Sequence, residues 1–377
     1  MAIATFDKSK PGDINFGIGQ PASDLMPVDL FSNFATSFFS QAMAEDFNYG
    51  PVGGDPRFLS ALSKFLSTSY EIAVSPKSLF LTAGNSHGID LVCERFTKPG
   101  DTILVEEASY FLAFPIFKDR QLNVISVPTD ANGVIVDQLE AAVKKHHPTA
   151  VYVIPDFNNP TGVSLSTCRR LELVNLSKLH DFVLISDDAY QMLSYTDASN
   201  QAIGALLDAG NVISLGTFSK ILAPGFRVGW IQSSERLLEK IRETGWLNSG
   251  GSVSHFGSQI VRYGLESGKQ EKHLQYLLSC YRGRVTAMHD ALLHHLGNEL
   301  TWEKPLGGYF FWLALNSKKD VGIMREEALS SRTGFQPGSL FSCDTDLNHY
   351  MRLSFSHYTE DQIWEGVSRL APIIKSN

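Results

Sequence analysis

The chain has 377 residues, of which 43% are hydrophobic and 19% charged, and its formal net charge is −8 at pH 7. This length allows two or three domains with a large buried core, and the composition is that of a soluble globular protein. Binding to nucleic-acid phosphates needs clustered Lys and Arg. Basic runs in this sequence, such as Lys144-Lys145, are short, so no nucleic-acid partner is expected.

No metal site, membrane span or export signal is expected either. The cysteines lie far apart and form neither a CxxC pair nor a Cys/His ligand spacing, which fits a reducing compartment. The N-terminal stretch "MAIATFDKSKPGD" lacks the apolar core of a signal peptide, and no apolar run approaches the length needed to cross a bilayer. The sequence therefore predicts a cytoplasmic protein.

Alternating strands and helices are predicted from about residue 79 onward. Short apolar runs, typical of buried strands, occur at 78–84, 101–107, 122–128, 150–155, 182–188 and 211–217. Amphipathic stretches, typical of helices, occur between them at 86–96, 110–120, 136–147 and 167–180. This alternation predicts an α/β fold with a mostly parallel sheet, and such sheets bind ligands at the carboxyl ends of their strands.

The pattern changes after about residue 270, where a long helical stretch leads to an apolar run, further helices and a last strand. This order predicts a smaller α+β domain. The N-terminal arm shows no clear sheet role and is expected to pack with that smaller domain. The predicted division is therefore a large domain at 46–270 and a small unit formed by 1–45 together with 271–377.

Polar clusters follow the predicted strands. Thr82 to Gly88 ends a strand and opens a helix, where free backbone N–H groups and the positive end of the helix dipole suit a phosphate. A capped helix start, with Asn85 or Ser86 as the N-cap, is the alternative. Tyr110 follows the next strand, either as a stacking surface or as a structural residue.

Two further clusters lie at later strand ends. Asp156 to Gly162 is a turn of the type Asn-Pro-Thr-Gly, and a functional role for it requires the Asn159 amide to point into a site. Asp187 and Asp188 end the strand at 182–188, and neighbouring side chains of an extended chain face opposite sides. At most one of these two carboxylates can therefore enter a given pocket.

The last cluster, "SLGTFSKILAPGFRVGW", places a lone lysine, Lys220, in an apolar and glycine-rich segment. An amine in such a segment either finds a partner or has a lowered pKa, which makes it a nucleophile. Thr217 and Ser219 lie two residues apart, and Arg227 follows a Pro-Gly turn. These two hydroxyls, the arginine and a helix N-terminus together form an anion site of the size of a phosphate.

The order of these motifs resembles the class I/II aminotransferases, the fold type I family that depends on pyridoxal 5'-phosphate. The resemblance runs from "NFGIGQP" near the start to "MRLSFS" near the end, and it is closest to the 2-aminoadipate and broad-specificity aromatic branch. It implies a mostly parallel seven-stranded sheet between helices, a small α+β domain and a homodimer. The implied reaction moves an amino group between an L-amino acid and a 2-oxo acid by a ping-pong aldimine mechanism.

The resemblance also assigns roles to residues. Lys220, Asp187 and Tyr190 are the implied catalytic residues: Lys220 forms the Schiff base and Asp187 meets the pyridine nitrogen. The implied cofactor-binding residues are Gly84, Asn85, Ser86, Tyr110, Asn159, Asp187, Tyr190, Thr217, Ser219, Lys220 and Arg227, with Tyr49 acting from the partner subunit. The substrate carboxylate is implied to meet Arg352, with Gly19 and Asn159 nearby. The chain departs from the family at Ala108-Ser109-Tyr110, often Pro-Thr-Tyr, and at Asn85-Ser86, often Ser-Gln.

Several alternatives remain open at this level. A lyase or decarboxylase acting on an amino acid would use the same cofactor, and a non-catalytic effector module could bind it, although no DNA-binding domain precedes residue 1. "GIGQPA" matches a dinucleotide fingerprint but lacks the following βαβ context. The preferred amino donor and 2-oxo acid are not predicted; specificity is expected around Ser23 to Met26. The loop Asn248 to Ser254 is either part of a site or a plain loop.

Overall fold

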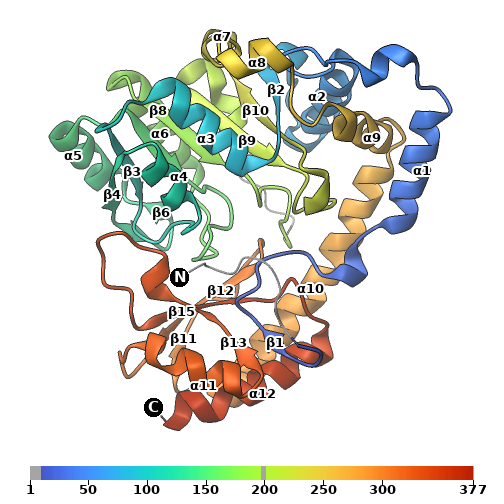
Figure 1. Cartoon of the computed structure of the whole chain (residues 1–377). Coiled ribbons are helices and arrows are strands. Elements are labelled where there is room, and N and C mark those ends of the chain that lie inside the picture. The colour runs from blue at the N-terminus through green and yellow to red at the C-terminus, as the bar shows by residue number, and fades with distance from the viewer. Residues whose placement is uncertain (1–9, 197–200, 377) are drawn as a thin grey trace.

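The computed structural model describes residues 10–196 and 201–376. A seven-stranded sheet forms the centre of the large domain, in the order β2-β10-β9-β8-β7-β3-β4, and only β10 runs antiparallel to its neighbours (Figure 1). Its strands are β2 (Leu79–Thr82), β3 (Thr102–Glu106), β4 (Asn123–Val127), β7 (Ala150–Val153), β8 (Val183–Asp187), β9 (Val212–Thr217) and β10 (Gly229–Ser233). The predicted mostly parallel sheet is confirmed, although β10 was not among the predicted strands.

Helices cover both faces of this sheet. Along β3, Leu104 packs in one hydrophobic cluster while its neighbours Ile103 and Val105 pack in another, because successive strand side chains point to opposite faces. Near-continuous apolar strands are the expected result of this double burial. The main helices of the large domain are α2 (Pro56–Tyr70), α3 (Asn85–Phe96), α4 (Ala113–Asp119), α5 (Val136–His146), α6 (Thr167–Leu179), α7 (Glu235–Arg242), α8 (Gly245–Gly250) and α9 (His255–Glu266). A short hairpin, β5 (Thr129–Asp130) and β6 (Gly133–Val134), lies at its edge.

The small domain begins along the long helix α10 (Lys269–Leu296), which packs against the last helix, α12 (Glu360–Ser376). Its antiparallel sheet has the order β11-β12-β15-β14, and α11 (Arg325–Ser330) lies beside it. The strands are β11 (Leu300–Thr301), β12 (Phe310–Leu315), β14 (Gln336–Pro337) and β15 (Tyr350–Ser354). The large domain lies above this sheet in Figure 1, with the carboxyl ends of its parallel strands facing down.

The N-terminal arm spans both domains. β1 (Ile14–Asn15) pairs in parallel with β13 (Thr333–Gly334) of the small domain. The expectation that the arm lacks a sheet role is therefore wrong for these residues, because a two-residue strand has no periodicity to detect. Farther along, α1 (Val28–Phe39) packs against α9.

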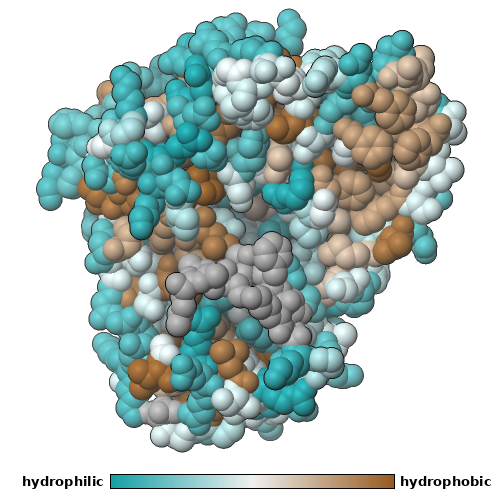
Figure 2. Space-filling model, in the orientation of Figure 1, coloured by the Kyte–Doolittle hydropathy of each residue, from teal (hydrophilic) through white to brown (hydrophobic). Residues whose placement is uncertain are grey.

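An apolar patch lies on the outer surface where α1 and α9 meet (Figure 2). Its exposed side chains include Phe39, Met43, Phe47 and Phe256. Elsewhere the surface is mainly hydrophilic in this view. Among the helices in the described ranges, none is both long and apolar enough to cross a membrane.

Candidate active site

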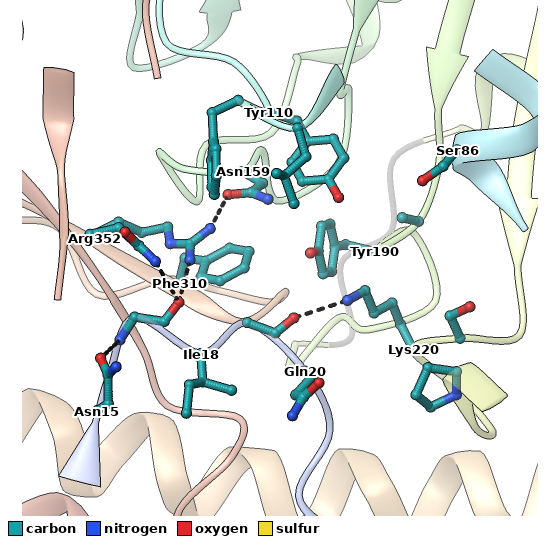
Figure 3. A pocket seen from close by; sticks show the side chains of 18 of the residues that line it. Asn15, Ile18, Gln20, Ser86, Tyr110, Asn159, Tyr190, Lys220, Phe310 and Arg352 are labelled. Carbon is teal, nitrogen blue, oxygen red and sulfur yellow. Dashed lines mark hydrogen bonds between the residues drawn. The ribbon is translucent and has the colours of Figure 1, made fainter. Parts of the chain in front are cut away.

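A cavity of about 970 Å³ lies between the strand ends of the large domain, the small-domain sheet and the N-terminal arm. It brings together residues that lie far apart in the sequence (Figure 3). The predicted site residues that line it are Gly19, Asn85, Ser86, Tyr110, Asn159, Asp187, Tyr190, Thr217, Ser219, Lys220, Arg227 and Arg352. Gly84 and Tyr49 are the predicted site residues outside this lining set, and the residues of the loop from Asn248 to Ser254 also lie outside it.

Lys220 lies in the turn that follows β9, and its amine reaches into the cavity (Figure 3). Nζ donates a hydrogen bond of 3.0 Å to the carbonyl oxygen of Gly19. The pKa of the amine is lowered to about 8, first by burial and then by the nearby Arg352 cation, while Asp187 opposes both. At mildly alkaline pH a large fraction of this amine is therefore the neutral nucleophile.

Asp187 ends β8 and is buried against the cavity, with 4% of its surface exposed. Burial raises the pKa of its carboxyl group, while hydrogen bonds from Tyr152 and Asn85 oppose that rise. Tyr152 Oη donates to Oδ2 at 2.7 Å, and Asn85 Nδ2 donates to Oδ1 at 2.5 Å. The carboxylate is thus held in one orientation by two donors.

The Asn85 side chain consequently points away from the place expected of a phosphate ligand. Its Nδ2 also donates to the carbonyl oxygen of Leu215 at 3.1 Å. Asn85 is the first residue of α3, so its backbone N–H has no acceptor within the helix and can still donate to an anion. Tyr152 was missed because it lies in the middle of an apolar strand. A tyrosine hydroxyl in such a strand needs a buried hydrogen-bond partner, and this need is the feature of the sequence that could have identified Tyr152.

Asp188 faces the opposite side of the strand, as the alternation of side chains requires. Its carboxylate accepts hydrogen bonds from Ser186 Oγ at 2.7 Å and from Ser214 Oγ at 2.5 Å. Burial raises the pKa of Asp188 to about 7. This carboxyl group is therefore part of a buried polar network behind the sheet edge.

An anion-binding corner lies at the N-terminus of α3. Gly84 is the N-cap, with φ of 86°, and a Cβ atom there would lie 2.8 Å from Nη2 of Arg227. Glycine therefore allows both the left-handed backbone and the close approach of the guanidinium. Thr217 Oγ1 donates to Ser219 Oγ at 2.9 Å on the facing turn. Hydroxyls, helix N–H groups and a guanidinium meet here, which is the donor set that a phosphate needs.

Arg352 lies in β15 on the opposite wall and is 3% exposed. Its Nη1 donates to Asn159 Oδ1 at 2.8 Å and its Nη2 donates to the Gly17 carbonyl at 2.9 Å. The guanidinium carbon lies 4.1 Å from the ring centroid of Phe310 and 5.0 Å from that of Phe341. Burial lowers the pKa of this group to about 10. No carboxylate forms an ion pair with Arg352 within the described ranges, so its positive charge is available for an anionic ligand.

The turn that carries Asn159 is held by buried charged groups that the sequence did not single out. Glu106 Oε2 accepts from the backbone N–H of Ile154 and from Asn158 Nδ2, both at 2.8 Å. Burial raises the pKa of Glu106 to about 8. Arg170, fully buried, forms an ion pair of 2.7 Å with Asp156. These contacts hold the turn in place, so that the Asn159 amide lies at the cavity.

The donor set along the cavity fits pyridoxal phosphate. The anion corner suits its phosphate, Asp187 suits a pyridinium nitrogen, and the Tyr110 ring offers a flat apolar face. Lys220 supplies an amine for the aldehyde. The fold and this site together define a pyridoxal-phosphate-dependent enzyme of fold type I.

Comparisons with known proteins identify the family. The family "Aminotransferase class I and II" matches residues 11–370. An aromatic-amino-acid aminotransferase of Thermococcus litoralis is 33% identical over 96% of this chain and 88% of its own. A multiple substrate aminotransferase from Thermococcus profundus superimposes with a TM-score of 0.91 at 32% identity, over 97% of this chain and 92% of the other. A kynurenine aminotransferase from Pyrococcus horikoshii gives a TM-score of 0.90 at 31% identity, over 97% and 91%.

The chain belongs to the class I and II aminotransferases. It is a pyridoxal-phosphate-dependent transaminase that moves an amino group between an amino acid and a 2-oxo acid. The predicted family, fold, reaction and cofactor are confirmed. The comparisons favour transamination over the lyase and decarboxylase alternatives.

Proposed function

We propose that amino-group transfer takes place in the cavity between Lys220 and Arg352. Lys220 carries out the chemistry, and Arg352 binds the substrate carboxylate. The observation that carries this proposal is a pair of nitrogen groups on opposite walls: a half-buried amine with a lowered pKa, and a buried guanidinium that forms no ion pair with a carboxylate of the described residues. When bound, pyridoxal phosphate supplies an electron sink for the electrons left at the substrate α-carbon. Asp187 would keep the pyridine nitrogen protonated, and Asn159 and Tyr190 would bond the phenolic oxygen.

Lys220 has two tasks in this proposal. Its amine would hold the cofactor through the aldehyde at rest, and the free amine would move a proton at the substrate α-carbon. A pKa of about 8 suits this second task, because the amine must both take up and release a proton near neutral pH. Arg227, Ser86, Thr217, Ser219 and the α3 N-terminus would hold the phosphate.

Arg352 is the proposed binding group for the substrate carboxylate. An amino acid and a 2-oxo acid share the same α-carboxylate, so one planar guanidinium serves both half-reactions. Asn159 Oδ1 and the Gly17 carbonyl, its present partners, would orient the guanidinium for that carboxylate. Gly19 lies on the same wall.

We infer that the amino donors are aromatic or large apolar amino acids. Ile18, Phe111, Leu112 and Phe310 line the cavity, and the ring centroids of Phe111 and Phe310 lie 5.9 and 4.1 Å from the guanidinium carbon of Arg352. Apolar walls favour apolar side chains, since each buried CH₂ contributes about 0.8 kcal/mol. The names of the similar proteins from Thermococcus litoralis and Pyrococcus horikoshii, for aromatic amino acids and kynurenine, agree with this inference.

We further propose a cytoplasmic homodimer in which Tyr49 reaches the phosphate of the partner subunit. Tyr49 is 84% exposed and does not line the cavity of its own chain. It lies close in sequence to the apolar patch, where the Phe38 ring packs edge-on against Phe47 and Phe256 at centroid distances of 5.8 and 5.5 Å. A second copy would bury this patch. The four free cysteines fit a reducing compartment.

A donor and acceptor screen tests the proposal. Each amino acid is mixed with the loaded enzyme, and the cofactor absorbance shows whether its amino group has been transferred. Aromatic donors should convert fastest. Borohydride reduction followed by peptide mapping should place the cofactor on Lys220. A label on another lysine would refute the assignment of Lys220, and a preference for small polar donors would refute the substrate inference.

A further inference from the structure

The turn that carries Lys220 is bonded to two buried side chains from outside the seven-stranded sheet. Tyr309, immediately before β12, donates from Oη to the carbonyl oxygen of Lys220 at 2.9 Å. Gln270, in the first turn of α10, donates from Nε2 to the carbonyl oxygen of Ile221 at 2.8 Å. Both side chains are at most 1% exposed. Two successive carbonyl groups of the turn are thus bonded to elements of the small-domain side.

The hydroxyl groups of Tyr281 and Tyr309 form a hydrogen bond in which only one of them can be the donor. A phenol has a single proton, and that of Tyr309 is used on the Lys220 carbonyl, which can only accept. The Tyr281 hydroxyl lies 3.1 Å from that of Tyr309, so Tyr281 is the donor in this second bond. A chain of bonds runs from Tyr281 through Tyr309 to Lys220, and such chains strengthen each member.

The place of Tyr309 is set by the junction between the domains. The backbone N–H of Gly308 donates to the Leu193 carbonyl at 3.0 Å, and that of Tyr195 donates to the Leu306 carbonyl at 2.8 Å. The Tyr195 hydroxyl also donates to the Gly308 carbonyl. The segment that immediately precedes Tyr309 is therefore bonded to the loop after β8.

The Tyr309 ring also limits where the lysine amine can move. Lys220 Nζ lies 5.5 Å from the centroid of the Tyr309 ring and 5.9 Å from that of the Tyr190 ring. The same side chain thus contacts the lysine at both ends, through its hydroxyl at the backbone and through its ring near the amine. Tyr190 lines the cavity, whereas Tyr309 lies behind it.

We propose that Tyr309 is a positioning residue for Lys220: its hydroxyl, supported by Tyr281, holds the lysine backbone so that the amine meets the reacting atoms. This inference rests on the proposed role of Lys220. The hydroxyl should affect the rate of steps that use the amine and leave the binding of substrate and phosphate unchanged, since it touches neither.

The test compares Tyr309→Phe with Tyr281→Phe and with a matched control, Tyr195→Phe. The control removes a buried hydroxyl from the same junction, bonded to the neighbouring carbonyl of Gly308, without touching Lys220. In Tyr309→Phe, the limiting rate of the amino-acid half-reaction should fall about five- to tenfold, the effect of one lost hydrogen bond, with the amino-acid Kd unchanged. Tyr281→Phe and Tyr195→Phe should each lose less than Tyr309→Phe, because neither hydroxyl is bonded to Lys220.

A second readout does not depend on turnover. The rate at which the cofactor-free protein attaches pyridoxal phosphate covalently, trapped by borohydride, should fall by the same factor in Tyr309→Phe. The affinity for a cofactor analogue without the aldehyde should stay at the parent value. Equal rates in all variants, or equal losses in Tyr309→Phe and Tyr195→Phe, would overturn the inference. Trapping on another lysine in the parent protein would instead refute the proposed role of Lys220.

Discussion

The two walls of the cavity are built in different ways. On the large-domain wall, Asp187 is the last residue of β8 and Lys220 follows β9 by three residues, so each side chain is placed by the strand that precedes it. On the opposite wall, Arg352 lies in the middle of β15. Its partners, Gly17 and Asn159, are 335 and 193 residues away along the chain.

The charges of the walls differ as well. The large-domain wall pairs a buried carboxylate with an amine, and each shifts the pKa of the other toward its charged form. The opposite wall holds a buried cation whose partners are neutral oxygens and aromatic rings. A buried charge without a counter-charge is destabilising, and a ligand carboxylate offsets this. We therefore expect mutations in the first wall to affect chemistry and mutations in the second to affect binding.

Replacing the amine should produce the largest loss. Lys220→Ala removes the proposed nucleophile and proton carrier together, so the rate of amino-group transfer should fall by at least about 10³-fold. The phosphate and ring contacts remain, so the cofactor should still bind without a covalent bond. Stopped-flow absorbance and equilibrium dialysis measure the two quantities. Transfer at more than a hundredth of the parent rate would contradict the role of Lys220.

The two neighbouring carboxylates should differ sharply. Asp187→Ala removes the proposed partner of the pyridine nitrogen, so the half-reaction rate should fall by about 10²- to 10³-fold while the cofactor is still bound. Asp188→Ala removes only the acceptor for Ser186 and Ser214 and should cost roughly 1 kcal/mol of stability, with a much smaller loss of rate. Equal catalytic losses would show that both carboxylates serve the cavity.

Arg352→Lys tests whether the second wall governs binding. Lysine keeps the charge but loses the planar pair of donors, so both amino acid and 2-oxo acid should bind more weakly by about 2 kcal/mol. Attachment of the cofactor to Lys220 should stay unchanged. Titration of both substrates against the cofactor absorbance gives the two Kd values. Unchanged binding of both would place the carboxylate elsewhere.

The smallest expected effect concerns Asp188 and pH. Its pKa in the folded protein is about 7, above the ordinary value of 3.8, so the folded state holds the proton more tightly than the unfolded state. The contribution of Asp188 to stability therefore falls as pH rises from about 4 to about 7 and stays lower above that range. Asp188→Asn removes this contribution, so its stability relative to the parent should be higher at pH 8 than at pH 4. Urea unfolding at the two pH values measures the difference, and an identical pH dependence in the parent and the variant would rule it out.

The residues of the large-domain wall can be predicted well from local sequence. A buried strand must end in polar residues where it leaves the sheet, and parallel strands end at one edge, so the strand pattern is enough to place Asp187, Lys220 and Asn159 together. The supports behind them were missed. Tyr152, Glu106 and Arg170 make contacts 35, 48 and 14 residues away, which no local pattern encodes.

The sequence by itself determined the alternation of strands and helices, the sheet that follows from it and the polar residues at its edge, because burial and strand geometry act over a few neighbouring residues. Tertiary structure alone decided the pairing of β1 with β13, the turn of the Asn85 side chain toward Asp187 and the contact of Tyr309 with Lys220. Each of these depends on a partner brought near by the packing of whole domains, and a hydrogen bond forms only when that packing sets its distance and angle.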